Sequence, residues 1–243
     1  MRCFKLLWLC AVLSACAAPG PTAELRPALT EITADQPGTR FAVDPVRSVV
    51  RIHAFRAGRA ANLGHNHVLT VPRMSGTLLL PSADSLAGAQ FELTFRLDEL
   101  ALDLPEMRAA LGPGWASLMT AEAIAATRAN MLGEGNLQAA RFPVVALRAR
   151  QIGGEMPKLV AELEIELHGQ RRTQWVALQA ERKEGAFTAR GALVVRQSDF
   201  GIAAFSVLGG LLAVRDELLI EFEIQTSPSK GSTSTNSPAT TSP

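Results

Sequence analysis

Apolar and polar residues alternate along much of the chain, most clearly between residues 158 and 168. Glu162, Glu164, Glu166 and His168 occupy every second position there, and the positions between them are apolar. Because side chains alternate across a strand, this pattern predicts a β-strand with one dry face and one wet face. The apolar positions are Leu159, Ala161, Leu163, Ile165 and Leu167.

Five further segments share this period, around residues 50–54, 91–97, 145–149, 187–195 and 218–224. Short turn sequences separate the strands, among them Asp44-Pro45, Gly153-Gly154, His168-Gly169 and Glu184-Gly185. Strands joined this tightly are antiparallel neighbours. About eight such strands can hide their dry faces by packing two sheets or by curling one sheet into a barrel, and closure also removes exposed edges. Both arrangements predict an all-β fold.

One interval, from Leu104 to Gly135, breaks this rhythm with the chemistry of helices. Pro105 suits a first helical turn, the Gly112-Pro113-Gly114 run stops it, and Thr120 to Leu132 predicts a second helix. We expect a helical insertion between strands that crosses the barrel or covers one of its ends. Its apolar residues are expected to pack against the sheet; they are Leu111, Trp115, Leu118, Met119, Ile124 and Met131.

The inward rows mix large apolar residues with small ones. An eight-stranded barrel is just wide enough to be filled by its own side chains or to hold one small ligand. A dry channel would suit an extended hydrocarbon, since burial from water is favourable by roughly 0.8 kcal/mol per methylene. The alternative is a filled core, and the period alone leaves both open. The small inward residues are expected to be Ala149, Ala161, Ala177, Ala189 and Gly191.

The two ends of the chain differ in composition from its middle. Residues 1–15 combine Arg2 and Lys5 with a short apolar run and predict an export signal, too short to span a bilayer as a helix. The run ends in Leu13-Ser14-Ala15-Cys16, which resembles a bacterial lipoprotein cleavage box. We expect a lipidated Cys16, a tether over residues 16–39, a folded domain over 40–226 and a disordered Ser/Thr/Pro tail over 227–243.

This reading places the protein in the bacterial cell envelope. Lipidated Cys16 and the following Ala17 favour an outer-membrane lipoprotein that faces the periplasm and meets the membrane only through its amino-terminal lipid. The alternative is an ordinary signal peptide and a soluble periplasmic protein. The sequence does not determine the oligomeric state, and a homodimer is one of the open alternatives.

Cysteine and charge narrow the function classes. The three cysteines are Cys3, Cys10 and Cys16, so a chain cut before Cys16 can form no internal disulfide or thiolate metal site. The signal also takes two of the 24 basic residues, leaving 22 against 23 acidic ones. A nearly neutral domain argues against a nucleic-acid partner, which needs a basic face.

The Leu63-Gly64-His65-Asn66-His67-Val68 stretch carries the most reactive chemistry in the chain. If it is extended, His65 and His67 share a face and Asn66 takes the other. The two imidazoles could contact a ligand's polar group at the cavity mouth, cap backbone groups in a turn, or bind a metal with His53 from a neighbouring strand. No phosphate loop or catalytic carboxylate pair is present.

Several short motifs, taken in order, resemble one family. They are Phe41-Ala42-Val43-Asp44-Pro45 with Ser48, Gly64-His65-Asn66-His67, Arg141-Phe142-Pro143, Leu167-His168-Gly169 and Ser198-Asp199-Phe200-Gly201-Ile202. From about Arg40 to Thr226 the chain resembles the YceI-like family of bacterial periplasmic proteins, also called the polyisoprenoid-binding domain. The resemblance implies an all-β fold, an extended antiparallel eight-stranded lipocalin-like barrel, with a bound isoprenoid or other long-chain lipid, and no enzyme. Gln197 stands where the family usually has arginine.

We therefore expect a periplasmic, lipid-anchored, non-enzymatic binding protein that holds an isoprenoid, quinone-like or fatty-acyl lipid in a barrel cavity. The alternative is a metal-binding protein or metal-dependent enzyme built on His53, His65 and His67. A third reading is an envelope scaffold with a filled barrel. The expected ligand-binding residues are His65, His67, Phe91, Phe95, Leu163, Ile165, Phe187, Leu193 and Phe222.

Overall fold

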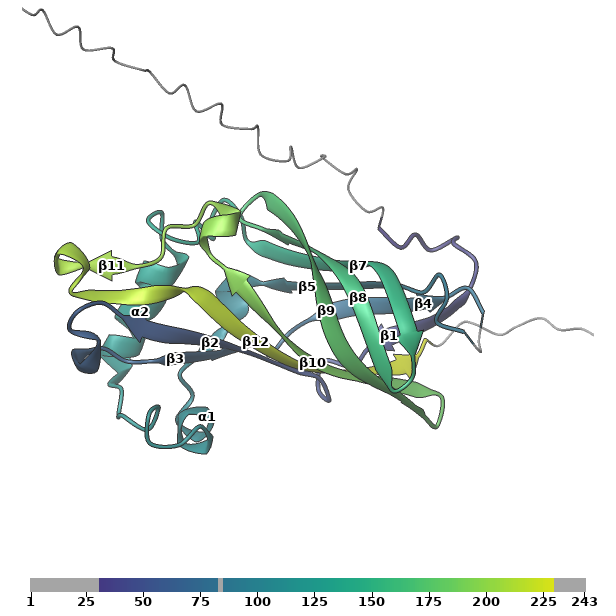
Figure 1. Cartoon of the computed structure of the whole chain (residues 1–243), viewed down its shortest axis with the longest axis horizontal. Coiled ribbons are helices and arrows are strands. Elements are labelled where there is room, and N and C mark those ends of the chain that lie inside the picture. Colours follow the sequence, from purple (N-terminus) through teal and green to yellow (C-terminus); the bar gives the residue numbers. More distant parts are fainter. Residues whose placement is uncertain (1–30, 83–84, 230–243) are drawn as a thin grey trace, which may run out of the picture.

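The computed structural model describes residues 31–82 and 85–229, and the strands in this part of the chain form one continuous sheet (Figure 1). The predicted export signal, Cys16, the first part of the tether and nearly all of the predicted tail lie outside the described residues. The strands are β1 (Thr39–Val43), β2 (Val49–Ala57), β3 (His67–Thr70), β4 (Ser75–Leu80), β5 (Gln90–Arg96), β6 (Ala101–Leu102), β7 (Val144–Glu155), β8 (Lys158–Leu167), β9 (Gln170–Lys183), β10 (Ala186–Arg196), β11 (Ser206–Val207) and β12 (Leu212–Pro228).

The sheet closes into a barrel because β1 pairs with both β4 and β12. The order around the barrel is β1-β4-β5-β7-β8-β9-β10-β12, which makes eight strands, each antiparallel to its neighbours. The earlier part of β12 pairs with β2 along the edge whose last residues pair with β1. The sheet continues from β2 to β3 and β6, which lengthens one side of the barrel. The predicted eight-stranded antiparallel barrel is confirmed.

Strand β12 is the longest strand described, with 17 residues. It pairs with β10 along one edge and with β2 and then β1 along the other. Its pairing with β2 slips between Val214 and Leu218, a β-bulge of the kind that bends a strand near the rim of a barrel. β12 ends at Pro228 opposite Phe41, so the strand runs past the expected domain boundary at Thr226.

The helical insertion lies between β6 and β7, as predicted. Helix α1 (Pro105–Ala110) begins with proline, and α2 (Ala121–Leu132) begins after Thr120, whose Oγ1 accepts a hydrogen bond from the Ala123 amide at 3.2 Å. Figure 1 shows α2 across the end of the barrel that also carries β11. None of the described helices is long and apolar enough to cross a membrane.

The expected packing of the insertion is only partly correct. Ile124 and Met131 of α2 pack against the barrel core, but Leu118 is 98% exposed. Trp115 lies against His53 and Phe55 on the outer face of β2, with ring centroids 5.4 and 5.9 Å away. The 111–120 segment has no helical period, so its sequence did not indicate which apolar residues are buried.

The barrel core divides into clusters along its length. At the end that contains β1 and β4, a buried cluster closes the interior, and the Phe41 and Phe187 rings meet edge to face at 5.1 Å. We call this the closed end. Its buried members are Phe41, Leu78, Leu80, Ala89 and Phe187.

Candidate functional site: an apolar cavity with one polar end

A cavity of about 360 Å³ occupies the barrel interior. Its volume is within the range of small-molecule sites, roughly 300–1,000 Å³. No lysine, arginine, aspartate or glutamate lines it, and His67 is the single titratable side chain among its described lining residues. The inward rows predicted from the alternation line it, including Val50, Ile52, Ala54, Val145, Leu147, Ala149, Leu159, Ala161, Leu218 and Ile220.

Most of the expected ligand-binding residues lie along this cavity. They come from four strands and from the start of β3, which places them around the whole barrel wall. His65 is the exception, because it precedes β3 and is exposed on the outside. The expected residues that line the cavity are His67, Phe91, Phe95, Leu163, Ile165, Phe187, Leu193 and Phe222.

The expectation about small inward residues is partly wrong. Ala149, Ala161 and Ala189 line the cavity, but Ala177 is exposed on the outer face, where β9 pairs it with Val160 of β8. Gly191 provides room for packing instead: a Cβ there would lie 2.7 Å from the Phe222 ring. Apolar residues occupy both faces of β9 around Ala177, so the period gave the wrong face.

The cavity reaches the surface at the end opposite the closed end. Of its lining residues, only Asn130 of α2 and Phe205 are exposed, Phe205 by 36%. Polar side chains also gather here, because Asn136 and Gln197 line the cavity and are anchored to the carbonyls of Ala203 and Arg215 at 3.0 and 2.8 Å. We call the opening between α2 and Phe205 the mouth.

A buried polar network holds His67 near the mouth. Asp103, which is 1% exposed, accepts hydrogen bonds from His67 Nδ1 at 2.6 Å, from the Val68 amide at 3.0 Å and from Arg108 Nη1 at 2.7 Å. Arg108 Nη1 also donates to the Asn66 carbonyl at 2.7 Å. Helix α1 thus fixes the start of β3 through a buried ion pair.

The network continues to the surface through Ser117. Its Oγ accepts a hydrogen bond from Arg108 Nη2 at 2.9 Å and lies 3.1 Å from His65 Nδ1. Desolvation, together with the neighbouring charges of His67 and Arg108, lowers the pKa of His65. The two histidines therefore take part in one network but have different surroundings, one in the cavity wall and one outside.

The hydrogen bond to Asp103 determines which ring nitrogen of His67 carries a hydrogen. Burial by itself would raise the pKa of Asp103, but the hydrogen bonds from His67, Val68 and Arg108 outweigh it, so the pKa of Asp103 is lowered. Because the Asp103 carboxylate accepts, Nδ1 of His67 carries the hydrogen, and Nε2 of the neutral ring is an acceptor. Nε2 has no hydrogen-bond partner in the described part of the chain, and the ring lines the cavity.

The metal alternative is not supported by the placement of its histidines. His53 lies on the outer face of β2, buried, with Nε2 2.9 Å from Glu221 Oε2, whereas His67 lies on the inner face opposite Ala54. Because Ala54, the partner of His67, faces inward and His53 faces outward, the two rings lie on opposite faces of the sheet. Among the described residues, no group of three or more His, Cys, Asp or Glu side chains could hold a metal ion.

Three of the short motifs meet at one structural cluster. His168 Nδ1 lies 3.0 Å from the Phe200 carbonyl, and its ring contacts Phe142 at 4.8 Å. Gly169 has φ +70°, and a Cβ there would lie 2.8 Å from the Phe142 ring. Ser198 donates both its amide hydrogen, at 2.8 Å, and its hydroxyl hydrogen to the Asp216 carboxylate. These motifs fix turns and contain no arrangement for nucleophilic catalysis.

Sequence reasoning missed Asp103, Arg108 and Ser117. The available signal was weak: a charge of each sign beside a proline helix start, in a segment otherwise predicted to pack by apolar contacts. The partners of Asp103 are far apart in sequence, since His67 is 36 positions away.

The sequence matches no protein-family model and no curated protein. The structure, however, is similar to solved structures. The Burkholderia cenocepacia protein BcnA matches with 15% identity over 75% of this chain and 98% of that chain, at a TM-score of 0.53. A polyisoprenoid binding domain from Saccharophagus degradans, implicated in plant cell wall breakdown, matches with 12% identity over 78% and 98%, at a TM-score of 0.54.

The chain has a YceI-like fold. The fold expected from the short motifs is thereby confirmed. A Campylobacter jejuni YceI protein is also among the matches, with 8% identity over 67% of this chain and 85% of that chain, at a TM-score of 0.49. At these identities the likeness concerns the fold alone, and the function is argued from the site.

Proposed function

We propose that this protein is a lipid-anchored binding protein of the bacterial periplasm that holds a long-chain apolar ligand and catalyses no reaction. The single observation that carries the proposal is the cavity: its described lining is apolar and contains no lysine, arginine, aspartate or glutamate, and it is closed at one end by Phe41 and Phe187 and open at the other. Isoprenoid, quinone-like and fatty-acyl chains fit this description.

The energetics favour a chain over a compact polar molecule. Each methylene moved from water into such a cavity contributes roughly 0.8 kcal/mol, so several methylenes outweigh the ordering of a flexible chain. A polar or charged ligand would find few partners along the wall and would lose its hydration. The ligand therefore enters tail first, towards the closed end.

The polar end of the ligand then lies near the mouth. In the neutral ring, with Nδ1 donating to Asp103, Nε2 of His67 is an acceptor for a terminal hydroxyl. Asn136 and Gln197 add amide groups at the same end. Few polar groups in a mostly apolar pocket is the usual arrangement for orienting a ligand.

The polyisoprenoid-binding domain of Saccharophagus degradans supports an isoprenoid as the first ligand to test. Localisation follows from Cys16 and the residues around it, which resemble a lipoprotein box. Attachment through the amino-terminal lipid would keep the barrel beside the membrane that supplies its ligand.

Mass spectrometry of the intact protein under gentle conditions tests this proposal. We expect an amino-terminal lipid on Cys16 and one additional long-chain molecule that is lost on denaturation. A protein that carries no such molecule and, after delipidation, takes up neither a polyisoprenol nor a quinone would contradict it. Cys16→Ser is the matched control, because it should lose the anchor and keep the cavity ligand.

A further inference from the structure

Two loops next to the mouth form a surface that differs from the rest of the barrel. The first covers residues 58–64 and includes a short 3-10 helix, η1 (Ala61–Leu63); the second covers 205–211 and includes β11 and η4 (Leu208–Gly210). The Ala60 amide donates to the Leu211 carbonyl at 2.9 Å, so the loops lie together. We call residues 58–64 and 205–211 the tip.

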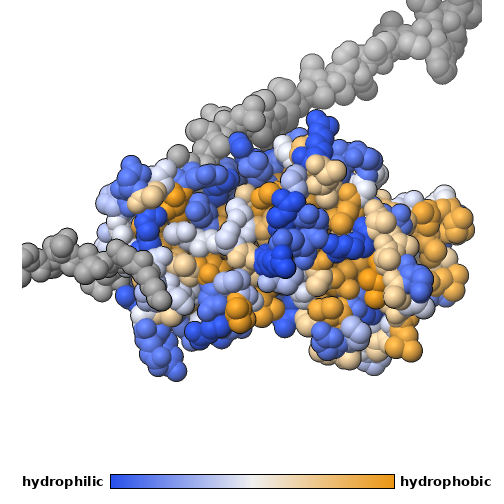
Figure 2. Space-filling model, turned by 180° about the vertical axis from the view of Figure 1, so that it is seen from behind, coloured by the Kyte–Doolittle hydropathy of each residue, from blue (hydrophilic) through white to orange (hydrophobic). Residues whose placement is uncertain are grey.

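The tip exposes large apolar side chains. Leu63 and Leu208 are each 71% exposed, and Val207 is 37% exposed. Figure 2 shows apolar residues gathered at this end of the molecule, on the right in that view. Leu208 has φ +53°, a backbone conformation that favours glycine or asparagine, yet the position carries an exposed leucine.

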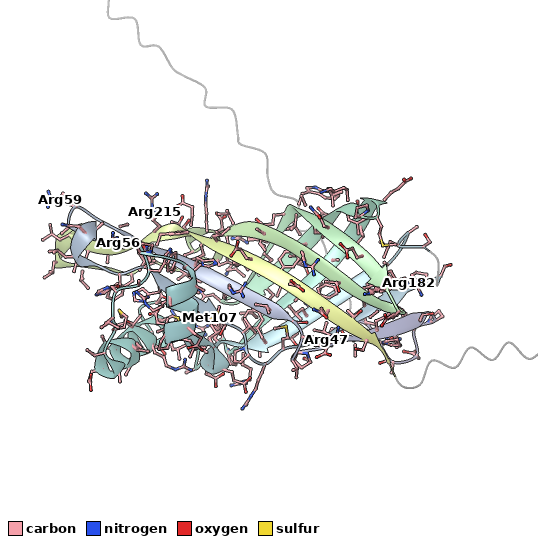
Figure 3. All side chains as sticks on the ribbon, turned by 90° about the horizontal axis from the view of Figure 1, so that it is seen from below. Arg47, Arg56, Arg59, Met107, Arg182 and Arg215 are labelled. Carbon is pink, nitrogen blue, oxygen red and sulfur yellow. The ribbon has the colours of Figure 1, made fainter. Side chains whose placement is uncertain are left out.

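The charged residues of the tip and of its flanking segments 56–66 and 203–215 are all arginine. Arg56, Arg59 and Arg215 are exposed and lie at this end in Figure 3, and none of them forms an ion pair with another described residue. Segments 56–66 and 203–215 contain no aspartate or glutamate. Exposed leucines surrounded by uncompensated arginines are complementary to a bilayer surface with anionic head groups.

The tip is also continuous with the cavity. Phe205 lines the cavity, is 36% exposed and directly precedes β11. An apolar path therefore leads from the exposed Leu208 through Val207 and Phe205 to the interior. A tip seated on a bilayer would place the mouth beside the lipid head groups.

We propose that the tip docks on anionic phospholipid bilayers, with Leu63 and Leu208 inserted among the head groups and Arg59 and Arg215 against the phosphates. Docking rests on the exposure and charge of the tip; its use in exchanging the cavity ligand with the bilayer rests on the proposed function. The expected tether of residues 16–39 can reach roughly 80 Å. That exceeds the roughly 55 Å spanned by the 17 residues of β12, so an anchored protein can turn its tip to its own membrane.

The test uses the chain from residue 16 onward with Cys16→Ser, so that neither an acyl anchor nor the predicted export signal contributes, and vesicles of equal parts phosphatidylcholine and phosphatidylglycerol. Leu63→Trp reports on the tip, and Val46→Trp is the matched control, because Val46 is 91% exposed but lies in the β1–β2 turn. Vesicles should blue-shift the added emission of Leu63→Trp, and brominated phospholipids in the vesicles should quench it. The added emission of Val46→Trp should remain unchanged in both experiments. Parent protein corrects for the emission of Trp115 and Trp175.

A second arm tests the charges. Arg59→Gln should weaken vesicle binding about fivefold, whereas Arg47→Gln, beside Val46, should not change it. Leu208→Asn, which suits the backbone, should also weaken binding. Equal quenching at both tryptophan positions, or none at Leu63→Trp, would overturn the proposal.

A third outcome would also overturn it: a blue shift of Leu63→Trp that grows with protein concentration without vesicles would make the tip an interface between copies. Ligand content, measured separately by mass spectrometry, distinguishes a failure of docking from a failure of the proposed function.

Discussion

The two ends of the barrel are built on different principles. At the closed end, Phe41, Leu80 and Phe187 bury apolar surface against each other. Backbone pairing of β1 with β4 and apolar packing hold this end together. At the mouth, Asp103, Arg108 and His67 are buried as a hydrogen-bonded set, and the loops beside them expose leucine and arginine. The difference indicates that one end is made for stability and the other for contact.

The largest expected effect is on the polar network. Asp103→Ala leaves His67 and Arg108 without their buried acceptor, and we expect the free energy of unfolding to fall by about 3–5 kcal/mol. Urea denaturation measures it. Asp98→Ala, which removes an exposed partner of Arg96, should cost less than about 1 kcal/mol. Equal losses would show that Asp103 is not the centre of the mouth.

The closed end should respond to loss of volume. Phe41→Ala removes a ring that is 2% exposed and should lower the free energy of unfolding by about 3 kcal/mol, through lost burial and the cavity left behind. The exposed Val46→Ala should stay within about 0.5 kcal/mol. If Phe41→Ala were as mild as Val46→Ala, the cluster would not close the barrel.

Acid should weaken the mouth through Asp103. Its pKa is lowered in the folded protein, so the unfolded chain binds the proton first, and the stabilisation is present above about pH 4 and is lost as the pH falls through the folded pKa. Denaturation curves between neutral and acid pH should show this loss in the parent. In Asp103→Asn the loss should be smaller, and an unchanged pH profile would contradict the assignment.

A smaller effect is expected on ligand choice. His67→Leu removes the acceptor in the cavity wall and should reduce the preference for a polyisoprenol over its hydrocarbon about fivefold, the contribution of one hydrogen bond. Competition between the two lipids on delipidated protein measures the preference. His65→Leu is the control, because His65 lies outside the cavity and should leave the preference unchanged.

The sequence was informative wherever a structural feature repeats locally. A period of two identifies Leu163 and Ile165 as inward without knowledge of any partner strand, and Thr120 and Pro105 mark helix starts through their own backbone chemistry. The same alternation around Ile52 already implied that His53 points outward, which is where it lies. The metal hypothesis was based on the three histidines as residue types and did not use the alternation that places His53 on the outer face.

The mouth could not be predicted in the same way. The pairing of Asp103 with His67 depends on how α1 docks against β3, and no local period encodes that docking. Leu118 and Ala177 show the same limit, because runs of apolar residues without a clear period do not identify the buried face.

The most direct measurement is lipid uptake by two matched variants of delipidated protein. Ala161→Phe places a ring inside the cavity, whereas Ala177→Phe places the same ring on the outer face of the adjacent strand. We predict that the parent and Ala177→Phe each bind one polyisoprenol in native mass spectra and that Ala161→Phe, still folded by circular dichroism, binds none. Equal binding by both variants would show that the ligand does not occupy the barrel interior.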